Sequence, residues 1–372
     1  MSRLRLAVVG SGHLGRIHAQ LAAALKNVQL VAVVDPVATA RKQVAADTGA
    51  KPLADYRELF GTVDAAVIAT PTIYHSQVAT DLLHGGLHLL VEKPMTSTLA
   101  EAEKLVALAR GQQLVLQVGH VERFNPALIS VREKLDDPKF IEARRASGYT
   151  FRSTDVGVVM DLMIHDIDVV LSLVQSSVSR VEAVGFSVLG DHEDMVSARL
   201  HFASGCVANL TASRVSYAPE RKMQVFTGQC CATLDFATRR ASIIEPIPEV
   251  LDREFQVEAL SGEQKNHLRE HLFSDLLIRQ DLPAVENNAI EQELLDFATA
   301  IQTEASPQVT GNDGRDAIAV AEQVLEQVAA HQWDGAAGSR RGALAMPLTP
   351  TVLSEPEQWS EDDTVVRKRL AG

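Results

Sequence analysis

A glycine-rich turn between an apolar segment and a helical segment constrains the fold of this chain more than any other feature. The apolar run Leu4–Val9, typical of a buried strand, leads directly into Gly10-Ser11-Gly12-His13-Leu14-Gly15, and a helical pattern begins inside the turn. A second apolar run, Gln29–Val34, ends at Asp35, twenty residues after Gly15. This spacing predicts a strand–turn–helix–strand unit of the kind that binds a dinucleotide.

The residues of this fingerprint have distinct physical roles. Gly10 permits the tight turn, Gly12 lets the backbone approach a pyrophosphate, and Gly15 lets the helix pack closely on the strand. Amide groups at the helix N-terminus favour phosphate oxygens. Asp35 is expected to accept hydrogen bonds from the adenosine ribose, and its charge disfavours a 2′-phosphate, so NAD is predicted over NADP. The alternative is a glycine turn in an α/β fold that binds no nucleotide.

Strands and helices alternate through the first third of the chain. Three further apolar runs are predicted strands, at Ala65–Ala69, Leu87–Val91 and Leu114–Val118. Helical patterns at 36–48, 73–83 and 98–110 separate them. Alternation at this spacing predicts an α/β fold with a doubly wound parallel sheet, expected over residues 1–122.

The pattern changes after residue 122. Val156–Val174 has apolar residues at helical spacing and is predicted to form one long helix. Short strand-like runs follow and predict a mostly antiparallel sheet, at Val181–Leu189, Val196–Phe202, Cys206–Ser213, Lys222–Thr227, Cys231–Phe236 and Ala241–Ile244. Closing helices are predicted at Asn288–Thr303 and Gly314–His331. The second domain is expected over residues 123–333, and 334–372 as an irregular tail or arm.

Composition argues against several classes of protein. The net charge of -13 disfavours nucleic-acid binding, which usually needs a basic surface. No apolar run approaches the length of a membrane-spanning helix, and no signal peptide precedes the first strand, so a cytoplasmic location is expected. The three cysteines lack the spacing of a metal site, and no metal is predicted.

Glu92-Lys93-Pro94 places a lysine directly after the apolar run Leu87–Val91. Ligands of open α/β sheets bind outside the carboxyl ends of the strands, so Lys93 and the glycine turn are predicted at the same edge. Lys93 could there orient a substrate hydroxyl and pass on its proton, while Glu92 holds the lysine or contacts the cofactor. The predicted cofactor contacts are Gly10, Gly12, His13, Leu14, Gly15, Asp35, Thr70, Pro71, His75, Glu92 and Lys93.

Polar residues interrupt the apolar helix predicted at Val156–Val174. Asp161 and His165 are four residues apart and share one helix face, Asp168 lies near that face, and Asp166 points elsewhere. Ionisable groups in a buried helix need partners or a ligand. A histidine is suited to accept the proton of an alcohol as its hydride leaves, so His165 is a predicted base. The alternative is a His–Asp pair that only stabilises helix packing.

The glycine fingerprint, Glu92-Lys93-Pro94 and Asp161-x-x-x-His165 together resemble the Gfo/Idh/MocA oxidoreductase family over residues 4–330. The resemblance implies an N-terminal Rossmann domain and a C-terminal α/β domain with a large, mostly antiparallel open sheet. That sheet often forms the oligomer interface in the family, which implies a homodimer or homotetramer. Lys93, Asp161 and His165 match the family's catalytic residues, with His165 as the proton acceptor and the other two assisting.

The resemblance also implies a substrate class. Arg123-Phe124-Asn125-Pro126 and Met160–Asp168 look like the branch that contains UDP-N-acetylglucosamine 3-dehydrogenases. Arg123 and Asn125, together with Lys93, Asp161 and His165, are therefore predicted substrate contacts. A nucleotide sugar also needs groups for its diphosphate, and Arg123, Arg152 and Arg214 are candidates.

The predicted function is NAD-dependent oxidation of a secondary hydroxyl of a sugar or nucleotide sugar to a keto-sugar. One alternative is an inositol or free-polyol dehydrogenase. A second is a non-catalytic NAD(H)-sensing protein on the same fold, which would not need Lys93, Asp161 and His165 together. A third is an enzyme that retains its cofactor and uses it for internal redox chemistry.

Overall fold

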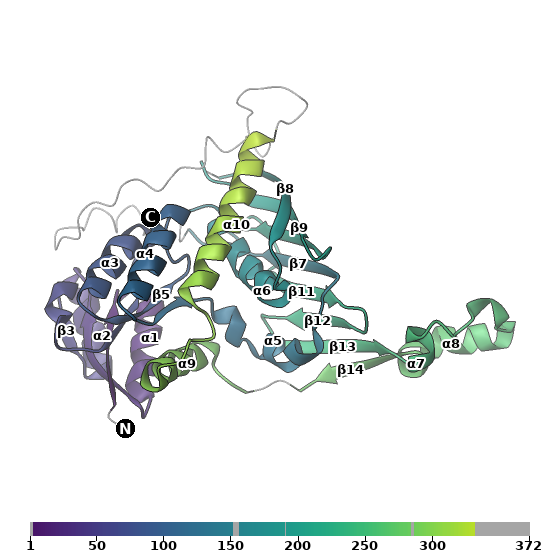
Figure 1. The fold of residues 1–372 in the computed structure, drawn as a ribbon, viewed down its shortest axis with the longest axis horizontal. Helices are drawn as coiled ribbons and strands as arrows, with labels where there is room; N and C mark the ends of the chain where they lie inside the picture. The colour runs from purple at the N-terminus through teal and green to yellow at the C-terminus, as the bar shows by residue number, and fades with distance from the viewer. Residues whose placement is uncertain (1–2, 152–155, 190, 284–285, 332–372) are drawn as a thin grey trace.

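The computed structural model describes residues 3–151, 156–189, 191–283 and 286–331, which are built around two β-sheets (Figure 1). The first sheet has the strand order β3-β2-β1-β4-β5-β6, and all of its pairs are parallel. Its strands are β1 (Leu4–Val9), β2 (Val28–Val34), β3 (Lys51–Leu53), β4 (Ala65–Ile68), β5 (His88–Glu92) and β6 (Leu116–Gly119). The helices between them are α1 (His13–Ala24), α2 (Ala38–Thr48), α3 (His75–His84) and α4 (Leu99–Gly111). The prediction of a doubly wound parallel sheet is confirmed.

The central strands of this sheet are apolar because both of its faces are covered. Every residue of β4 is buried, and β1 exposes only Arg5. Ala7 and Val9 of β1 belong to one cluster of buried side chains, and Leu6 and Val8 belong to another. Successive side chains of a strand point to opposite faces, so the continuous apolar run serves two cores at once.

The second sheet has the strand order β14-β13-β12-β11-β7-β10-β9-β8. Only the β7–β10 pair is parallel, so the prediction of a mostly antiparallel sheet is confirmed. Its strands are β7 (Phe140–Ala146), β8 (Val178–Phe186), β9 (Met195–Phe202), β10 (Val207–Ser213), β11 (Glu220–Phe226), β12 (Cys231–Asp235), β13 (Arg240–Pro246) and β14 (Leu277–Leu282). The sequence pattern did not predict β7 or β14, and β7 lies in the middle of the sheet.

Two helices, α6 (Ile164–Val174) and α10 (Gly311–Ala330), cover one face of the second sheet (Figure 1). The helix predicted over Val156–Val174 is present from residue 158 to residue 174, but its first turn is π-helical rather than α-helical. A π-helical turn at Val159–Met163 precedes α6, and residues 152–155 lie outside the described part of the chain. The wider π turn changes the phase of the side chains, so spacing by four no longer assigns residues 161 and 165 to one face.

The chain returns to the first sheet after it has formed the second. Helix α9 (Ala289–Thr303) packs on α1, and Leu294 and Phe297 of α9 complete one core of the first sheet. The segment before α10 then pairs with β6, the edge strand. The Val118 amide donates to the Val309 carbonyl at 3.3 Å, and Gln117 forms an antiparallel bridge with Thr310. The amino-terminal half therefore depends on residues from the far end of the chain.

The remaining elements are short or peripheral. Helix α5 (Pro126–Val131) follows the first sheet, whereas α7 (Pro248–Leu251) and α8 (Gly262–Asp275) lie beyond the ends of β13 and β14 (Figure 1). Short 3₁₀ turns occur at Tyr56–Leu59, Thr72–Tyr74, Val121–Phe124, Arg132–Lys134 and Val257–Ala259. Within the described ranges, no helix has both the length and the apolar character needed to span a membrane. The proposed tail, 334–372, lies outside the described residues.

Candidate active site

A pocket of about 240 Å³ lies where the carboxyl ends of β4 and β5 meet the π-helical turn. It brings together the predicted cofactor turn, the predicted lysine and the predicted aspartate. Its lining residues are Leu14, Ala69, Thr70, Pro71, Thr72, His75, Glu92, Lys93, Pro94, Val156 and Asp161. Residues from both halves of the chain therefore form one site at the sheet edge where ligands of this fold class bind.

Lys93 crosses from the first sheet to the π-helical turn. Its Nζ atom donates to the Asp161 backbone carbonyl at 2.7 Å and lies 3.3 Å from Asp161 Oδ1. The two side chains are 15% and 25% exposed, so the ion pair is accessible from the pocket but shielded from bulk water. The Lys93–Pro94 peptide bond is cis. The lysine thus has a fixed position and keeps a third N–H available for a ligand.

His165, in the first turn of α6, is a partly exposed imidazole whose Nδ1 atom is buried without a hydrogen-bond partner. Burial, followed by the positive charges of Lys93 and Arg145, lowers the pKa of His165 well below its usual value of 6.5. The ring is therefore neutral at neutral pH. A neutral imidazole can accept a proton from a hydroxyl group.

The π-helical turn is held by residues from the loop before β9. The Val159 amide donates to the Glu193 carboxylate at 3.1 Å, and the Val158 amide donates to the Glu193 carbonyl at 2.9 Å. A Cβ atom on Gly157 would overlap the same carboxylate. Burial raises the pKa of Glu193. Glycine at 157 therefore lets this loop approach the turn that carries Asp161.

A buried ion cluster includes Asp166, the residue that follows His165. Arg145 of β7 binds Asp166 and Glu122, each at 2.8 Å, and all three side chains are at most 8% exposed. Burial alone would lower the pKa of Arg145, but Asp166 and Glu122 outweigh it and raise that pKa. Asp166 therefore points away from His165, as predicted, and its partner is a guanidinium that the sequence pattern did not reveal.

The glycine turn has the geometry that a dinucleotide requires. Gly10 has φ +103°, and a Cβ there would overlap the Ala69 carbonyl, while a Cβ on Gly15 would overlap the Gly10 carbonyl. Gly12, in contrast, has no neighbouring atom within 4 Å of such a Cβ, which leaves its backbone open to a ligand. Gly12 also caps α1 without a side chain, so the helix amides are available to phosphate oxygens.

Asp35 lies beside the glycine turn, at the end of β2. Its carboxylate accepts from the Ser11 amide and from the Val37 amide, both at 2.8 Å. An acidic residue at the end of the second strand is the group that meets the adenosine ribose in folds of this class. The residues at this edge fit NAD, and His13 and Leu14, both exposed in the first turn of α1, flank the phosphate position.

His75 connects the loops that follow β4 and β5. One ring nitrogen lies 2.9 Å from the Pro94 carbonyl oxygen and the other lies 2.9 Å from the Thr70 carbonyl oxygen. The Thr70 hydroxyl is buried without a partner at the pocket. We infer that His75 fixes the two loops, whereas Thr70 is placed to meet a ligand.

The structure does not bring Arg123 and Asn125 to this group. Arg123 is 4% exposed and binds Asp168 at 2.8 Å and Asp313 at 3.1 Å. Asn125 caps α5 and donates to Glu122 at 2.8 Å. These contacts favour a structural role at the junction of the two halves, and Asp168, the partner of Arg123, does not line the pocket.

The arginine candidates for a diphosphate are likewise already engaged. Arg214 binds Asp194 at 2.6 Å and the Val156 carbonyl at 2.7 Å, and Arg152 lies outside the described residues. The sequence pattern missed a further arginine, Arg221. Arg221 of β11 is exposed and pairs across the sheet with Arg145, and its positive charge contributes to the lowered pKa of His165. Paired residues of antiparallel strands share a face, so Arg221 lies on the His165 side of the sheet.

Two histidines in buried positions also escaped prediction. His18 of α1 is fully buried, and its Nε2 atom lies 2.7 Å from Glu92 Oε1. His120, directly after β6, is 1% exposed, and neither ring nitrogen has a hydrogen-bond partner. Burial lowers the pKa of His120. In the sequence, such a histidine is visible only as a polar residue on the apolar face of a predicted element. This pattern does not indicate which residue, distant in the sequence, is its partner.

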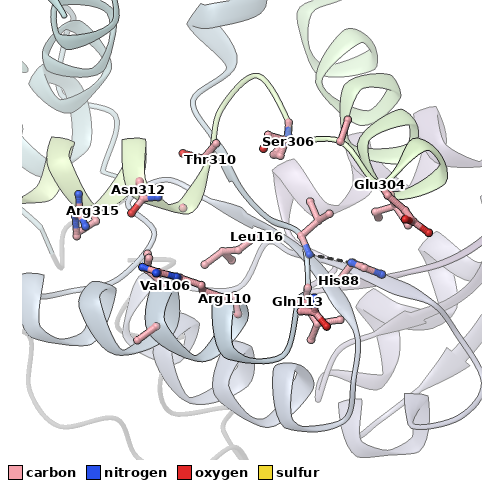
Figure 2. Close-up of a pocket in the computed structure, with 18 of the residues that line it drawn as sticks. His88, Val106, Arg110, Gln113, Leu116, Glu304, Ser306, Thr310, Asn312 and Arg315 are labelled. Atoms are coloured by element: carbon pink, nitrogen blue, oxygen red, sulfur yellow. Dashed lines mark hydrogen bonds between the residues drawn. The ribbon is translucent and has the colours of Figure 1, made fainter.

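A larger pocket, about 950 Å³, lies at the opposite edge of the first sheet (Figure 2). His88 and Leu116, which line it, are the first residues of β5 and β6, whereas Lys93 follows the last residue of β5. Its charged lining residues have mixed signs: Arg110, Arg315, Glu103 and Glu304. The larger pocket is therefore remote from the glycine turn and from Lys93.

Comparison with known proteins agrees with this site. A model of the oxidoreductase family with an NAD-binding Rossmann fold matches residues 4–120, and the GFO/IDH/MocA C-terminal domain matches residues 128–229. UDP-N-acetylglucosamine 3-dehydrogenase of Acidithiobacillus ferrooxidans is 34% identical over 338 residues, which cover 89% of this chain and 99% of that enzyme. A scyllo-inositol 2-dehydrogenase (NAD(+)) of Bacillus subtilis is 28% identical over 58% of this chain and 68% of its own length.

Solved structures show the same architecture. The Acidithiobacillus ferrooxidans enzyme superimposes with a TM-score of 0.77 over 88% of this chain and 98% of that one. A putative myo-inositol dehydrogenase of Sinorhizobium meliloti, 21% identical, shares the fold with a TM-score of 0.68 over 88% of this chain and 97% of that one. Fold and site together define an oxidoreductase that uses NAD. The chain belongs to the Gfo/Idh/MocA oxidoreductase family.

Proposed function

We propose that this enzyme oxidises a secondary hydroxyl of a nucleotide sugar to a ketone, with UDP-N-acetylglucosamine as the preferred test substrate. The observation that carries the proposal is the position of Lys93, which Asp161 holds at the pocket and whose charge helps to lower the pKa of His165. The UDP-N-acetylglucosamine 3-dehydrogenase of Acidithiobacillus ferrooxidans, 34% identical over 99% of its length, supports the substrate class.

The residues divide the proton chemistry between them. Lys93 donates a hydrogen bond to the substrate hydroxyl, and the carbonyl and carboxylate of Asp161 keep the ammonium directed into the pocket. His165 accepts the hydroxyl proton, which its low pKa allows at neutral pH. NAD, when bound at the glycine turn, supplies the hydride acceptor. The product is a keto-sugar, and the proton resides on His165 until solvent removes it.

We propose Arg221 as the contact for the substrate diphosphate. It is exposed on the His165 side of the sheet, and guanidinium groups recognise phosphates through paired N–H donors. Its neighbour Lys222 pairs with Arg144 on the other side of the sheet, where both contact Glu220. Arg221→Met is expected to raise KM for a nucleotide sugar about tenfold or more and leave KM for NAD unchanged. Lys222→Met is the matched control; equal effects of the two variants would contradict the assignment.

The substrate class is tested by following NADH absorbance with a panel of sugars and nucleotide sugars. We expect UDP-N-acetylglucosamine to reduce NAD and His165→Ala to abolish the signal. Turnover of myo-inositol without turnover of any nucleotide sugar would instead support a polyol dehydrogenase. This is the second candidate because the scyllo-inositol 2-dehydrogenase of Bacillus subtilis is also similar to this chain. NAD binding without turnover of any substrate would support the NAD(H)-sensing alternative.

We also propose that the enzyme is a homodimer or homotetramer assembled through the face of the second sheet that α6 and α10 leave uncovered. The large sheet provides a continuous surface for a second copy (Figure 1). Native mass spectrometry of the full chain tests the assembly, and a monomer at micromolar concentration would refute it.

A further inference from the structure

Glu293 of α9 is a fully buried carboxyl group without a hydrogen-bond partner. Its side chain is 0% exposed, and neither carboxyl oxygen contacts a donor. Its backbone is firmly placed, because Gln117 Nε2 of β6 donates to the Glu293 carbonyl at 3.1 Å. An unpaired buried carboxylate is strongly unfavourable, so its presence calls for a physical explanation.

The explanation lies in what surrounds Glu293. One side-chain nitrogen or oxygen atom from each of His18, Glu92 and Glu293 lies within 4.8 Å of the others. Glu92 already accepts from His18 at 2.7 Å through Oε1 and from the Lys93 amide at 3.3 Å through Oε2. Glu293 therefore approaches the residue that immediately precedes the proposed catalytic lysine.

The pKa values of the two carboxyl groups shift in opposite directions, although burial alone would raise both. Burial alone would raise the pKa of Glu92, but the hydrogen bond and charge of His18, followed by the charge of Lys93, lower it. Burial, then the negative charges of Glu92 and Asp296, raise the pKa of Glu293 well above its usual value. These shifts favour the ionised form of Glu92 and the protonated form of Glu293. Two close carboxyl groups commonly share one proton in this way.

Other charged groups near Glu293 are engaged elsewhere. Among the titratable and charged groups on the elements packed around it are His18 of α1, Glu92 of β5, Glu122 and Arg123 of the turn Val121–Phe124, and Asp296 of α9 itself. The same elements also carry His13 and Arg16 of α1, His88 of β5 and Glu291 of α9, and none of these four is buried. Arg123 is paired with two aspartates, and Glu122 is paired with Arg145. Asp296 accepts from the Gln308 amide at 2.8 Å. None of these supplies Glu293 with a compensating charge.

We propose that Glu293 is a positioning residue that stays protonated and donates a hydrogen bond to the Glu92 carboxylate, fixing the strand end from which Lys93 projects. The cluster then carries one negative charge, on Glu92, shared between a histidine N–H, a backbone amide and the Glu293 hydroxyl. Helix α9, which follows the second sheet in the sequence, thereby helps to fix the position of Lys93. The positioning role rests on the function proposed for Lys93, whereas the protonation of Glu293 does not.

Infrared difference spectroscopy of the full-length protein tests the protonation directly. Subtracting the spectrum of Glu293→Gln from that of the wild type at neutral pH should leave a positive carbonyl band of a protonated carboxylic acid. Asp296→Asn, on the same helix, should leave the Glu293 band in place. A wild-type spectrum without this band refutes the proposal, as does one equivalent of a divalent metal bound to the purified protein, which would require an ionised Glu293. This readout holds whichever substrate the enzyme uses.

The positioning role is tested by comparing Glu293→Leu with Glu293→Gln in NADH formation. Leucine removes the donor, and we expect kcat to fall about tenfold, equivalent to about 1.4 kcal/mol in the barrier, while KM for NAD changes little. Glutamine keeps an N–H donor and should restore most of the lost kcat. Equal kcat in wild type and Glu293→Leu, or no recovery with glutamine, overturns the role. If the leucine variant does not fold, the glutamine variant and the infrared bands still decide the matter.

Discussion

Lys93 Nζ lies 2.7 Å from the backbone carbonyl oxygen of Asp161 and 3.3 Å from Oδ1 of its carboxylate. The carbonyl is available because it belongs to a π-helical turn, where the regular helical hydrogen-bond pattern is interrupted. Substitution of the Asp161 side chain therefore removes only part of the support for the lysine. The relationship joins the strand that carries Lys93 to the helix that carries His165.

The proton-transferring roles are tested by Lys93→Met and His165→Ala. We expect each variant to bind NAD with nearly unchanged affinity, because the glycine turn and Asp35 are untouched. Turnover should fall by about 100- to 10,000-fold, the range typical of removing a general base or its partner. Steady-state NADH formation and fluorescence titration with NADH measure the two quantities. Turnover within a few-fold of wild type in both variants would contradict the assignment.

The pH dependence of His165 follows from its surroundings. Burial and the charge of Lys93 disfavour the imidazolium, so the pKa lies below 6.5, and His165 becomes protonated only as the pH falls through that lowered value. We expect oxidation to lose rate on the acid side below pH 6.5. Lys93→Met removes a positive charge and should raise the His165 pKa, as measured by histidine NMR in full-length protein. An unchanged or lower pKa in that variant would be inconsistent with the geometry.

The buried cluster around Arg145 should dominate the stability of the second sheet. Arg145→Met leaves Asp166 and Glu122 without their shared partner, and we expect the free energy of unfolding to fall by about 3–5 kcal/mol. Arg144→Met is the matched control, since the neighbouring arginine is 56% exposed in its pair with Glu220. Its effect should stay within about 0.5 kcal/mol. Urea unfolding of the two variants, side by side, makes the comparison.

Gly119 at the end of β6 should tolerate no side chain. A Cβ there would lie 2.9 Å from Glu92 Oε2 and 3.0 Å from the Glu92 Cα, so Gly119→Ala must displace the strand end that carries Lys93. We expect a loss of about 1–3 kcal/mol in unfolding free energy and a fall in kcat of at least about tenfold. Gly111→Ala, at the end of α4 with no atom within 4 Å of its Cβ, is the control and should leave kcat unchanged.

Protonation of Glu293 predicts a slope in stability with pH. The native pKa of Glu293 is raised above the unfolded value near 4.5, so above that pH the unfolded chain releases a proton that the native protein retains. Folding stability therefore falls as pH rises, by about 1.4 kcal/mol per pH unit for this group, until the native pKa is reached. Glu293→Gln lacks this contribution, so its stability relative to wild type should increase with pH. Urea unfolding of both proteins at several pH values measures this difference. Parallel curves of unfolding free energy against pH for the two proteins would contradict the prediction.

Local patterns sufficed to predict the cofactor turn and the lysine. Gly10, Gly12 and Gly15 stand between a strand and a helix, and each is explained by a contact with the backbone or by open space for a ligand. Lys93 was located because a charged residue directly after a buried strand must lie at the sheet edge. These inferences need only the period of a strand and the direction of a parallel sheet, both of which are local properties.

The missed features all depend on partners distant in sequence. Strand β7 was not predicted because Arg145 occupies an inward position, and only Glu122 and Asp166 make a buried arginine acceptable there. The π-helical turn cannot be read from apolar spacing, since Glu193 stabilises it from another loop. Arg123 resembled a substrate contact by its position in a motif, but Asp168 and Asp313 engage it in the fold.

The pairing of Val118 and Gln117 with the segment before α10 bears on how the protein is made. During synthesis the first 122 residues emerge with every strand of the parallel sheet present, yet β6 remains an open edge until Val309 has been translated. An open edge strand is a template for pairing with another chain. Truncations that end before α9 should therefore aggregate even though they contain the complete glycine turn. The order of synthesis leaves the nucleotide-binding half incomplete until the segment just before α10 has been made.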